Sequence, residues 1–122
     1  MTENYDSAAI HVLGAPDEGT AMTVAQALVR FGFASVAVHS RERVESAATL
    51  EWEVTVLDDG PYFDDDNVGE NAWAAIHQYA IAIATRLGGW EIGGTRCAPT
   101  TLQRKAFGAT HTFKLEALAR NP

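Results

Sequence analysis

Four histidines, one cysteine and sixteen carboxylates are the residues of this chain with the most obvious chemistry. No histidine lies three or four residues from another, so no helix can present a pair of imidazoles to a metal. His11 and His39 fall in segments typical of strands, and they could become neighbours if those strands pair. No spacing indicates further ligands or a nucleophile with its base. The sequence therefore predicts surface or core-edge histidines, with no metal site, no cofactor and no catalytic residue.

Cys97 is the only cysteine, so no intramolecular disulfide can form. Free cysteines are usually buried, and we expect a structural thiol in a reducing compartment. The polar start MTENYDSAA is unlike a signal peptide, and no apolar run approaches the ~18 residues that span a bilayer. These features predict a cytoplasmic protein without membrane association.

Two loops resemble ligand-binding loops only superficially. Gly14–Thr20 has the glycine spacing of a phosphate loop, but Thr20 stands where a lysine is needed. A turn capped by Asp17 or Thr20 is therefore expected. A calcium loop starting at Asp64 would place Ala75 where a bidentate glutamate is required, so no dedicated calcium site is predicted.

Carboxylates gather in the loop from Asp58 to Glu70, which also contains two large aromatic residues. One interpretation is a solvated loop whose charges maintain solubility. The other is a patch that binds an arginine-rich protein, with the aromatic rings as anchors and the carboxylates as partners of guanidinium groups. The predicted partner-binding residues are Asp58, Asp59, Tyr62, Phe63, Asp64, Asp65 and Asp66.

The net charge of −7 is unevenly distributed. Residues 1–66 carry 13 acidic and 3 basic side chains, whereas residues 67–122 carry 3 acidic and 6 basic ones. An acidic surface repels the phosphates of nucleic acid, so direct nucleic-acid binding is disfavoured. The acidic half instead matches a basic protein surface as its partner.

Apolar periodicity predicts the same order of elements twice, over residues 10–39 and again over residues 52–92. Each unit has a strand, a turn-rich loop, an amphipathic helix, a glycine and a second strand. Two such units are typical of a ferredoxin-like α/β domain of the α+β class, a two-layer sandwich with both helices on one face of a mainly antiparallel sheet. The expected core-facing helix residues are Met22, Ala25, Leu28, Val29 and Phe31 in the first unit and Trp73, Ile76, Ala80, Ile83, Ala84 and Leu87 in the second.

The chain is predicted to form a single domain over residues 1–122, with a frayed terminus at residues 1–8. Gly93-Gly94 should break or bulge the fourth strand. Residues 95–122 are expected to form a C-terminal extension or an extra strand.

A helix ending in FGFASVAV, a strand EWEVTV and a helix AIHQYAIAIATRLGG followed by Trp-Glu together resemble the RraB-type regulators of ribonuclease E activity. The resemblance spans Ala21–Ile92, and Gly88–Glu91 is its most specific part. It implies a small, acidic, ferredoxin-like and non-catalytic protein that binds a ribonuclease as an inhibitor. No partner-contact residue is carried over from the family.

Two other functions remain as alternatives. HVLGAPDEGTAMTVAQALVRFG is similar to the opening of ACT domains, which implies a sensor that binds an amino acid near Asp17–Gly19. A small ferredoxin-like enzyme would instead place His11, His39 and Glu53 in a pocket on the open sheet face. Trp52 and Phe33 could supply a homodimer contact, or the C-terminal extension could cover them.

Overall fold

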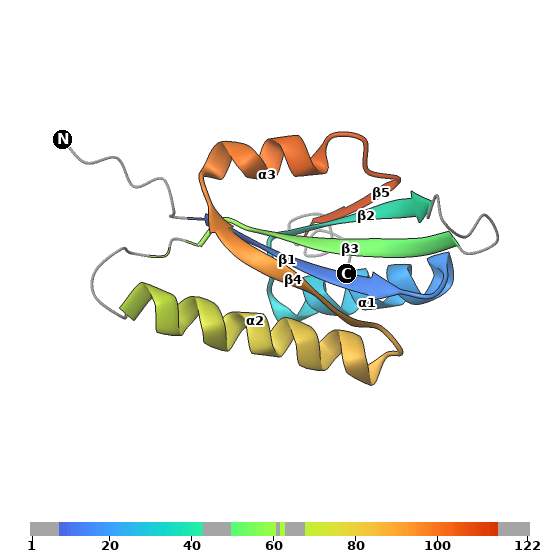
Figure 1. Cartoon of the computed structure of the whole chain (residues 1–122), viewed down its shortest axis with the longest axis horizontal. Coiled ribbons are helices and arrows are strands. Elements are labelled where there is room, and N and C mark those ends of the chain that lie inside the picture. The colour runs from blue at the N-terminus through green and yellow to red at the C-terminus, as the bar shows by residue number, and fades with distance from the viewer. Residues whose placement is uncertain (1–7, 43–49, 61, 63–67, 115–122) are drawn as a thin grey trace.

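The computed structural model describes residues 8–42, 50–60, 62 and 68–114. In this part of the chain five strands form one sheet in the order β4-β1-β3-β2-β5, and every neighbouring pair is antiparallel (Figure 1). Three described helices pack on this sheet, so the predicted α+β class is confirmed. The elements are β1 (Ala8–Ala15), α1 (Glu18–Phe31), β2 (Ser35–Glu42), β3 (Leu50–Asp58), α2 (Val68–Arg86), β4 (Trp90–Cys97), α3 (Pro99–Ala106) and β5 (His111–Lys114).

The strand order follows from two interleaved strand-helix-strand units. The unit β1-α1-β2 leaves a space between its strands that β3 occupies, and the unit β3-α2-β4 places β4 on the far side of β1. β5 is then added beside β2 through four paired positions. The predicted packing of helices on an antiparallel sheet is therefore correct, while membership of the ferredoxin-like folds stays a prediction.

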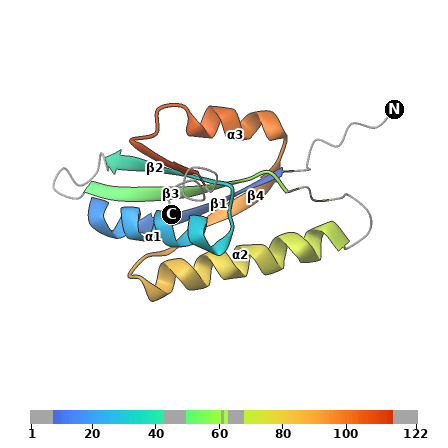
Figure 2. The same cartoon turned by 180° about the vertical axis from the view of Figure 1, so that it is seen from behind.

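The sheet carries helices on both faces. α1 and α2 cover one face and α3 covers the opposite face, as the two views show (Figures 1 and 2). The larger core lies between α1, α2 and the sheet, and its largest fully buried side chains include Leu13, Val24, Leu28, Val29, Val36, Val38, Val54 and Val56. The smaller core lies under α3 and contains Ala8, Ile10, Ala37, Leu57 and Cys97. Part of the region predicted as a C-terminal extension thus forms the second helix layer.

Local sequence signals determine both ends of α1. The Asp17 carboxylate accepts the Thr20 N–H at 2.7 Å, which confirms the predicted capped turn. Gly32 ends the helix at a φ of 135°, a conformation that favours glycine, and its N–H donates to two carbonyls of the last turn. The expected core position of Phe31 is wrong, because this last helical residue is 50% exposed. Its ring packs at a tilt against Tyr79 of α2, with ring centroids 5.3 Å apart. The buried face of α1 is Ala21, Val24, Ala25, Leu28 and Val29.

β4 contains the irregularity expected at the double glycine. Its pairing with β1 is regular from Cys97 to Gly93, and then the register shifts so that Glu91 faces Leu13 and Ile92 is left out. The predicted bulge is confirmed, and it places Glu91 on the side of the sheet that α2 covers, since Leu13 belongs to that core.

The remaining differences from the sequence predictions lie at the element ends. β1 already begins at Ala8, and residues 1–7 of the predicted frayed terminus lie outside the described residues. Asp58 is the last residue of β3 rather than part of the loop that follows. Leu87 is 37% exposed because α2 ends at Arg86, so its expected core position is also wrong. None of the helices described has both the length and the apolar content that crossing a bilayer would take.

Candidate functional site

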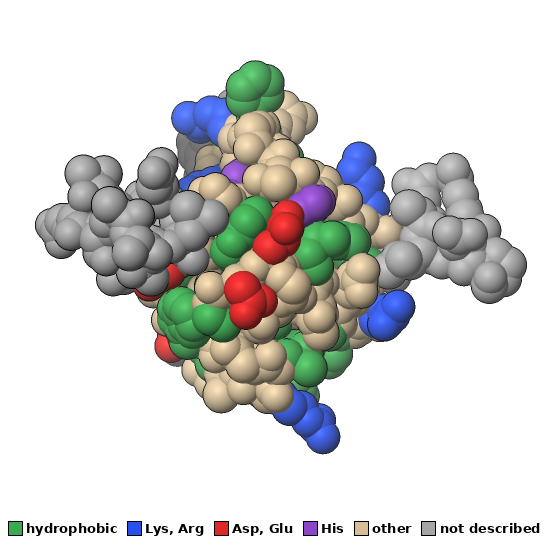
Figure 3. All heavy atoms as spheres, turned by 90° about the vertical axis from the view of Figure 1, so that its right-hand side faces the viewer, with side chains coloured by type: hydrophobic (Ala, Val, Ile, Leu, Met, Phe, Trp, Pro, Cys, Tyr) green, Lys and Arg blue, Asp and Glu red, His purple; other side chains and the backbone are tan. Residues whose placement is uncertain are grey.

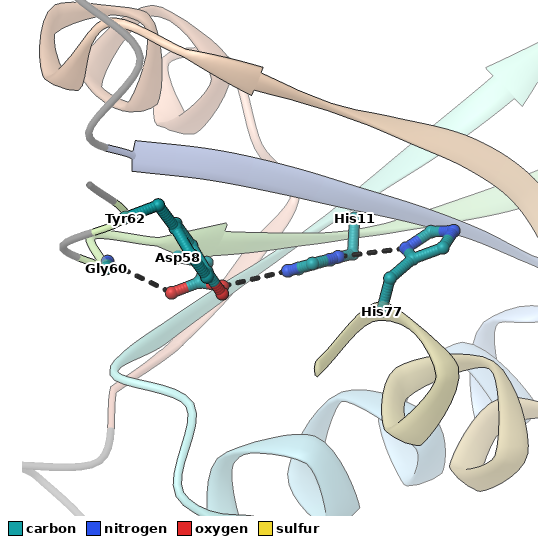
Figure 4. Close-up of polar contacts among 5 residues, drawn as sticks. All are labelled: His11, Asp58, Gly60, Tyr62 and His77. Carbon is teal, nitrogen blue, oxygen red and sulfur yellow. Dashed lines mark hydrogen bonds and ion pairs between the residues drawn. The ribbon is translucent and has the colours of Figure 1, made fainter. Parts of the chain in front are cut away.

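Two histidines from distant parts of the chain contact each other inside the larger core. His11 lies on β1 in the alternating position shared with Leu13, so its ring points toward the helices. His77 lies on α2, one turn after Trp73 and one turn before the buried Ala80. The two Nδ1 atoms are 2.9 Å apart, although 66 residues separate them in sequence (Figure 4). His11 is completely buried and His77 is 6% exposed.

The histidine pair is the centre of a longer series of polar contacts. His11 Nε2 is 2.9 Å from Asp58 Oδ2, and the Tyr62 hydroxyl donates to the same oxygen (Figure 4). The Gly60 N–H donates to Asp58 Oδ1 at 3.1 Å. On the other side of the pair, Nε2 of the α2 histidine is 2.9 Å from Glu91 Oε2. We call these five residues the histidine network: Tyr62, Asp58, His11, His77 and Glu91.

Hydrogen-bond chemistry determines which atoms of the histidine pair face a donor or an acceptor. An ionised carboxylate can only accept, so His11 Nε2 donates to Asp58. The contact between the two Nδ1 atoms places one proton between the two rings. The pair therefore links the two carboxylates, Asp58 and Glu91, in one continuous series of polar contacts.

The surroundings keep Asp58 ionised and Tyr62 neutral. Burial by itself raises the pKa of Asp58, but its hydrogen bonds, the strongest from His11, outweigh burial and lower the pKa below 3.8. Burial, the hydrogen bond to Asp58 and the charge of that carboxylate raise the pKa of the Tyr62 hydroxyl, while the Arg96 charge opposes the shift. Tyr62 is therefore a donor to a permanent carboxylate at neutral pH.

Aromatic rings enclose the histidine pair. The Trp73 ring stacks on His77 with centroids 4.9 Å apart and an interplanar angle of 9°, and it lies 6.0 Å from the His11 ring. Phe33, which is 6% exposed, lies against His11 with centroids 5.8 Å apart. This packing restricts the orientation of both imidazole rings.

Gly94 in β4 leaves the space that the His77 ring occupies. A Cβ at Gly94 would lie 2.9 Å from His77 Cε1 and 2.9 Å from the Ile10 carbonyl oxygen, whereas a Cβ at Gly93 would meet nothing within 4 Å. We expect Gly94→Ala to lower the free energy of unfolding by about 1–3 kcal/mol, because a backbone atom cannot move away as a side chain can. Gly93→Ala, the matched control, should change it by less than about 0.5 kcal/mol. Urea unfolding of both variants tests this, and equal effects would contradict it.

The predicted partner-binding residues fall into three groups. Asp58 and Tyr62 point inward, since the Asp58 side chain is 12% exposed and Tyr62 is 5% exposed, and both belong to the histidine network. Asp59 is exposed. Phe63, Asp64, Asp65 and Asp66 lie outside the described residues.

Two of the three residues proposed for an enzyme, His39 and Glu53, are brought together, and His11 is not. His11 and His39 lie on β1 and β2, which β3 separates, so the two histidines do not become neighbours. His39 pairs with Glu53 across β2 and β3, on the face opposite to the buried Val38 and Val54 and therefore opposite to His11.

The other sequence candidates have structural roles. Asp17 caps α1, and Glu18, next to it in the loop that resembles ACT domains, accepts from His111 Nε2 at 2.7 Å. Trp52 packs against the larger core instead of standing free on an open face. Cys97 is a buried thiol in the smaller core, as predicted. Among the described residues, no group of three or more His, Cys, Asp or Glu side chains is arranged to hold a metal ion.

A pocket of roughly 330 Å³ adjoins the network at the end of the sheet. It combines the Asp58 carboxylate with aromatic rings and the backbone of two glycines. At its edge the lining residue Phe31 forms an exposed aromatic pair with Tyr79, and 50% and 54% of their surfaces are accessible. The residues that line the pocket are Phe31, Gly32, Phe33, Asp58, Gly60, Tyr62 and Ile76.

The network positions the charged Asp58 carboxylate at the pocket, while the imidazole of His11 stays away from it. His11 is completely buried and does not line the pocket, so its imidazole cannot touch a molecule bound there. Of the network, only Asp58 and Tyr62 reach the pocket wall. The histidine pair lies behind the pocket wall, where the contact of His11 with Asp58 holds the carboxylate in position and favours its ionised state.

Nothing among known protein families, curated proteins or solved structures matches this chain. The site is therefore interpreted from its own chemistry.

Proposed function

We propose that this protein is a non-catalytic regulator that binds a basic surface of another protein, and that the partner is an RNA-processing ribonuclease that it inhibits. The resemblance of residues 21–92 to RraB-type regulators supports the choice of a ribonuclease. In this proposal the protein acts in the cytoplasm, where its single cysteine stays reduced, and it contacts the protein partner rather than the RNA.

The observation that carries the proposal is the exposed aromatic pair, Phe31 and Tyr79, beside a pocket with a carboxylate in its wall. Large aromatic side chains dominate the binding energy of protein interfaces. Carboxylates around them select a cation-rich partner and accelerate its association. Asp59 adds a second, exposed carboxylate between the pocket residues Asp58 and Gly60.

The charge distribution supports the same kind of partner. At the end of the molecule opposite the pocket, acidic side chains lie near the centre among apolar ones, with Lys and Arg toward the rim (Figure 3). Residues 1–66 carry ten more acidic than basic side chains. A basic protein would be attracted from a distance of about one Debye length, near 8–10 Å at physiological salt.

The environment of the reactive side chains supports a non-catalytic role. Cys97 and His11 lie in different cores, on opposite faces of the sheet, so they cannot form a nucleophile–base pair. The imidazole of His11 has no contact with solvent.

The test is capture of the partner from native cytoplasm at low and high salt, with identification by mass spectrometry. We expect a basic protein that is retained at low salt and released at high salt. Replacing Asp64, Asp65 and Asp66 with asparagine should weaken its binding about tenfold, given up to about 1 kcal/mol for each exposed ion pair. The control Arg104→Gln with Lys105→Gln removes charge from α3 and should not weaken binding. Unchanged binding of the triple variant would remove the acidic-patch interpretation.

A further inference from the structure

The pocket beside the histidine network has unusual chemistry for its size. At roughly 330 Å³ it is at the lower end of small-molecule sites, which matches one long side chain. Its wall contains a permanent carboxylate, Asp58, and the rings of Phe31, Phe33 and Tyr62. A neutral apolar occupant would cover that carboxylate without compensating it, and an anion would be repelled by it.

The Asp58 carboxylate retains capacity for one more donor. Its Oδ2 accepts from both His11 and Tyr62, and among the described residues its Oδ1 accepts only from the Gly60 N–H. A carboxylate offers about four acceptor positions, two on each oxygen. One position on Oδ1 is therefore available to a group in the pocket, and that group must be a hydrogen-bond donor.

Among cationic donors, the aromatic walls favour a guanidinium group over an ammonium group. A guanidinium is planar and weakly hydrated, it stacks on aromatic faces, and its N–H groups bond to carboxylates in a fixed geometry. An ammonium group is compact and strongly hydrated, so enclosing it between aromatic rings removes more solvation. Phe31 is available for such stacking because half of its surface is exposed.

We propose that this pocket receives the guanidinium group of an arginine side chain carried by the basic partner, with Asp58 as its hydrogen-bond acceptor and Phe31 as its stacking surface. The inference rests on the proposed function, since it names the group by which the partner is recognised. The exposed Phe31–Tyr79 pair extends beyond the pocket, where a free amino acid would not cover it but a protein segment would.

The test is an NMR titration of the full chain with three short peptides that differ at one position: arginine, lysine or citrulline, the neutral analogue of arginine. The backbone amides of Gly32 and Gly60 line the pocket and report its occupation. We expect the arginine peptide to shift both amides and to bind at least about fivefold more tightly than the lysine peptide, with no response to citrulline.

The matched variants are Phe31→Ala and Phe107→Ala, since Phe107 is an exposed phenylalanine that follows α3 on the opposite face. Phe31→Ala should weaken the arginine peptide about tenfold, as expected for a partly desolvated cation–aromatic contact, and Phe107→Ala should not weaken it. Equal behaviour of the two variants, equal binding of lysine or citrulline, or shifts confined to other amides would overturn the proposal. Circular dichroism of each variant establishes that it is folded.

Three further outcomes separate this inference from the proposed function. Binding of free L-arginine as tightly as the peptide would overturn the assignment to a protein-borne side chain and indicate a small-molecule sensor. If Phe31→Ala leaves a salt-sensitive protein partner bound at full strength, the pocket inference fails and the regulatory function survives. If the arginine peptide binds but no salt-sensitive partner is captured, the regulatory function fails while the guanidinium chemistry of the pocket is supported.

Discussion

Replacing His11 with leucine is expected to lower the free energy of unfolding by about 3–5 kcal/mol, the usual cost of removing one partner from a buried ion pair. The variant leaves the Asp58 carboxylate, 12% exposed, without the imidazole that compensates its burial. It also removes the partner of His77 Nδ1. Urea unfolding followed by circular dichroism measures the change. The slope of the free energy of unfolding against urea concentration should be the same in the wild type and the variant.

His111→Leu is the matched control for this variant. His111 makes the same type of contact with Glu18, at 2.7 Å, but the two side chains are 33% and 51% exposed. Exposed pairs contribute about 0–1 kcal/mol, so His111→Leu should have a small effect. Similar losses for the two variants would contradict the view that burial, and not the contact itself, makes His11 important.

A double variant identifies the source of the penalty. Combining His11→Leu with Asp58→Leu removes both the imidazole and the carboxylate that it compensates. Removing both partners of a buried pair costs less free energy than leaving one charged partner without the other. The double variant should therefore lose less free energy of unfolding than the sum of the losses in the two single variants.

The second large effect is a pH-dependent loss of stability in Asp58→Asn. At pH 7 the variant should be less stable than the wild type by about 2 kcal/mol, the usual value for hydrogen bonds to a charged group. The folded-state pKa of Asp58 lies below its unfolded value of 3.8, so the contribution of the carboxylate is complete above that value. It disappears as the pH falls through the folded-state pKa. The difference between wild type and variant should therefore shrink in acid.

Measurement of both proteins by urea unfolding between pH 7 and pH 2 tests this dependence. The pKa of Asp17 is also lowered, by its hydrogen bonds from Thr20, and it gives the wild type a further acid-sensitive contribution. Asp17 is unchanged in Asp58→Asn, so the difference between the two proteins isolates Asp58. A difference that stays constant over the whole range would show that the carboxylate charge is not what stabilises the fold.

Most of the fold could be predicted from local signals. The Asp17 cap, the Gly32 helix end and the bulge near Gly93 are each specified by a few adjacent residues. The regular apolar spacing in the two helices indicated which elements would form, and their repeated order indicated the α+β class. The errors at Phe31 and Leu87 occur at helix ends, where periodicity no longer determines which side is covered.

The histidine network could have been only partly anticipated. His11 alternates with Leu13 in an apolar strand, and His77 lies between Trp73 and Ala80 on the packed face of its helix. Those two positions suggest buried polar groups that need partners. They do not say that each is the partner of the other, nor that Asp58 would turn inward from an acidic stretch.

The sequence by itself determined most of the elements, the class of fold and the concentration of negative charge in the first half, because these depend on residues close together in the chain. Only the tertiary structure decided that β3 lies between β1 and β2, that α2 covers β1, and that the Phe31 ring stands beside Asp58. These contacts join residues dozens of positions apart. Their existence depends on which apolar faces meet in the folded chain, and that is settled by packing of the whole core rather than by any local pattern.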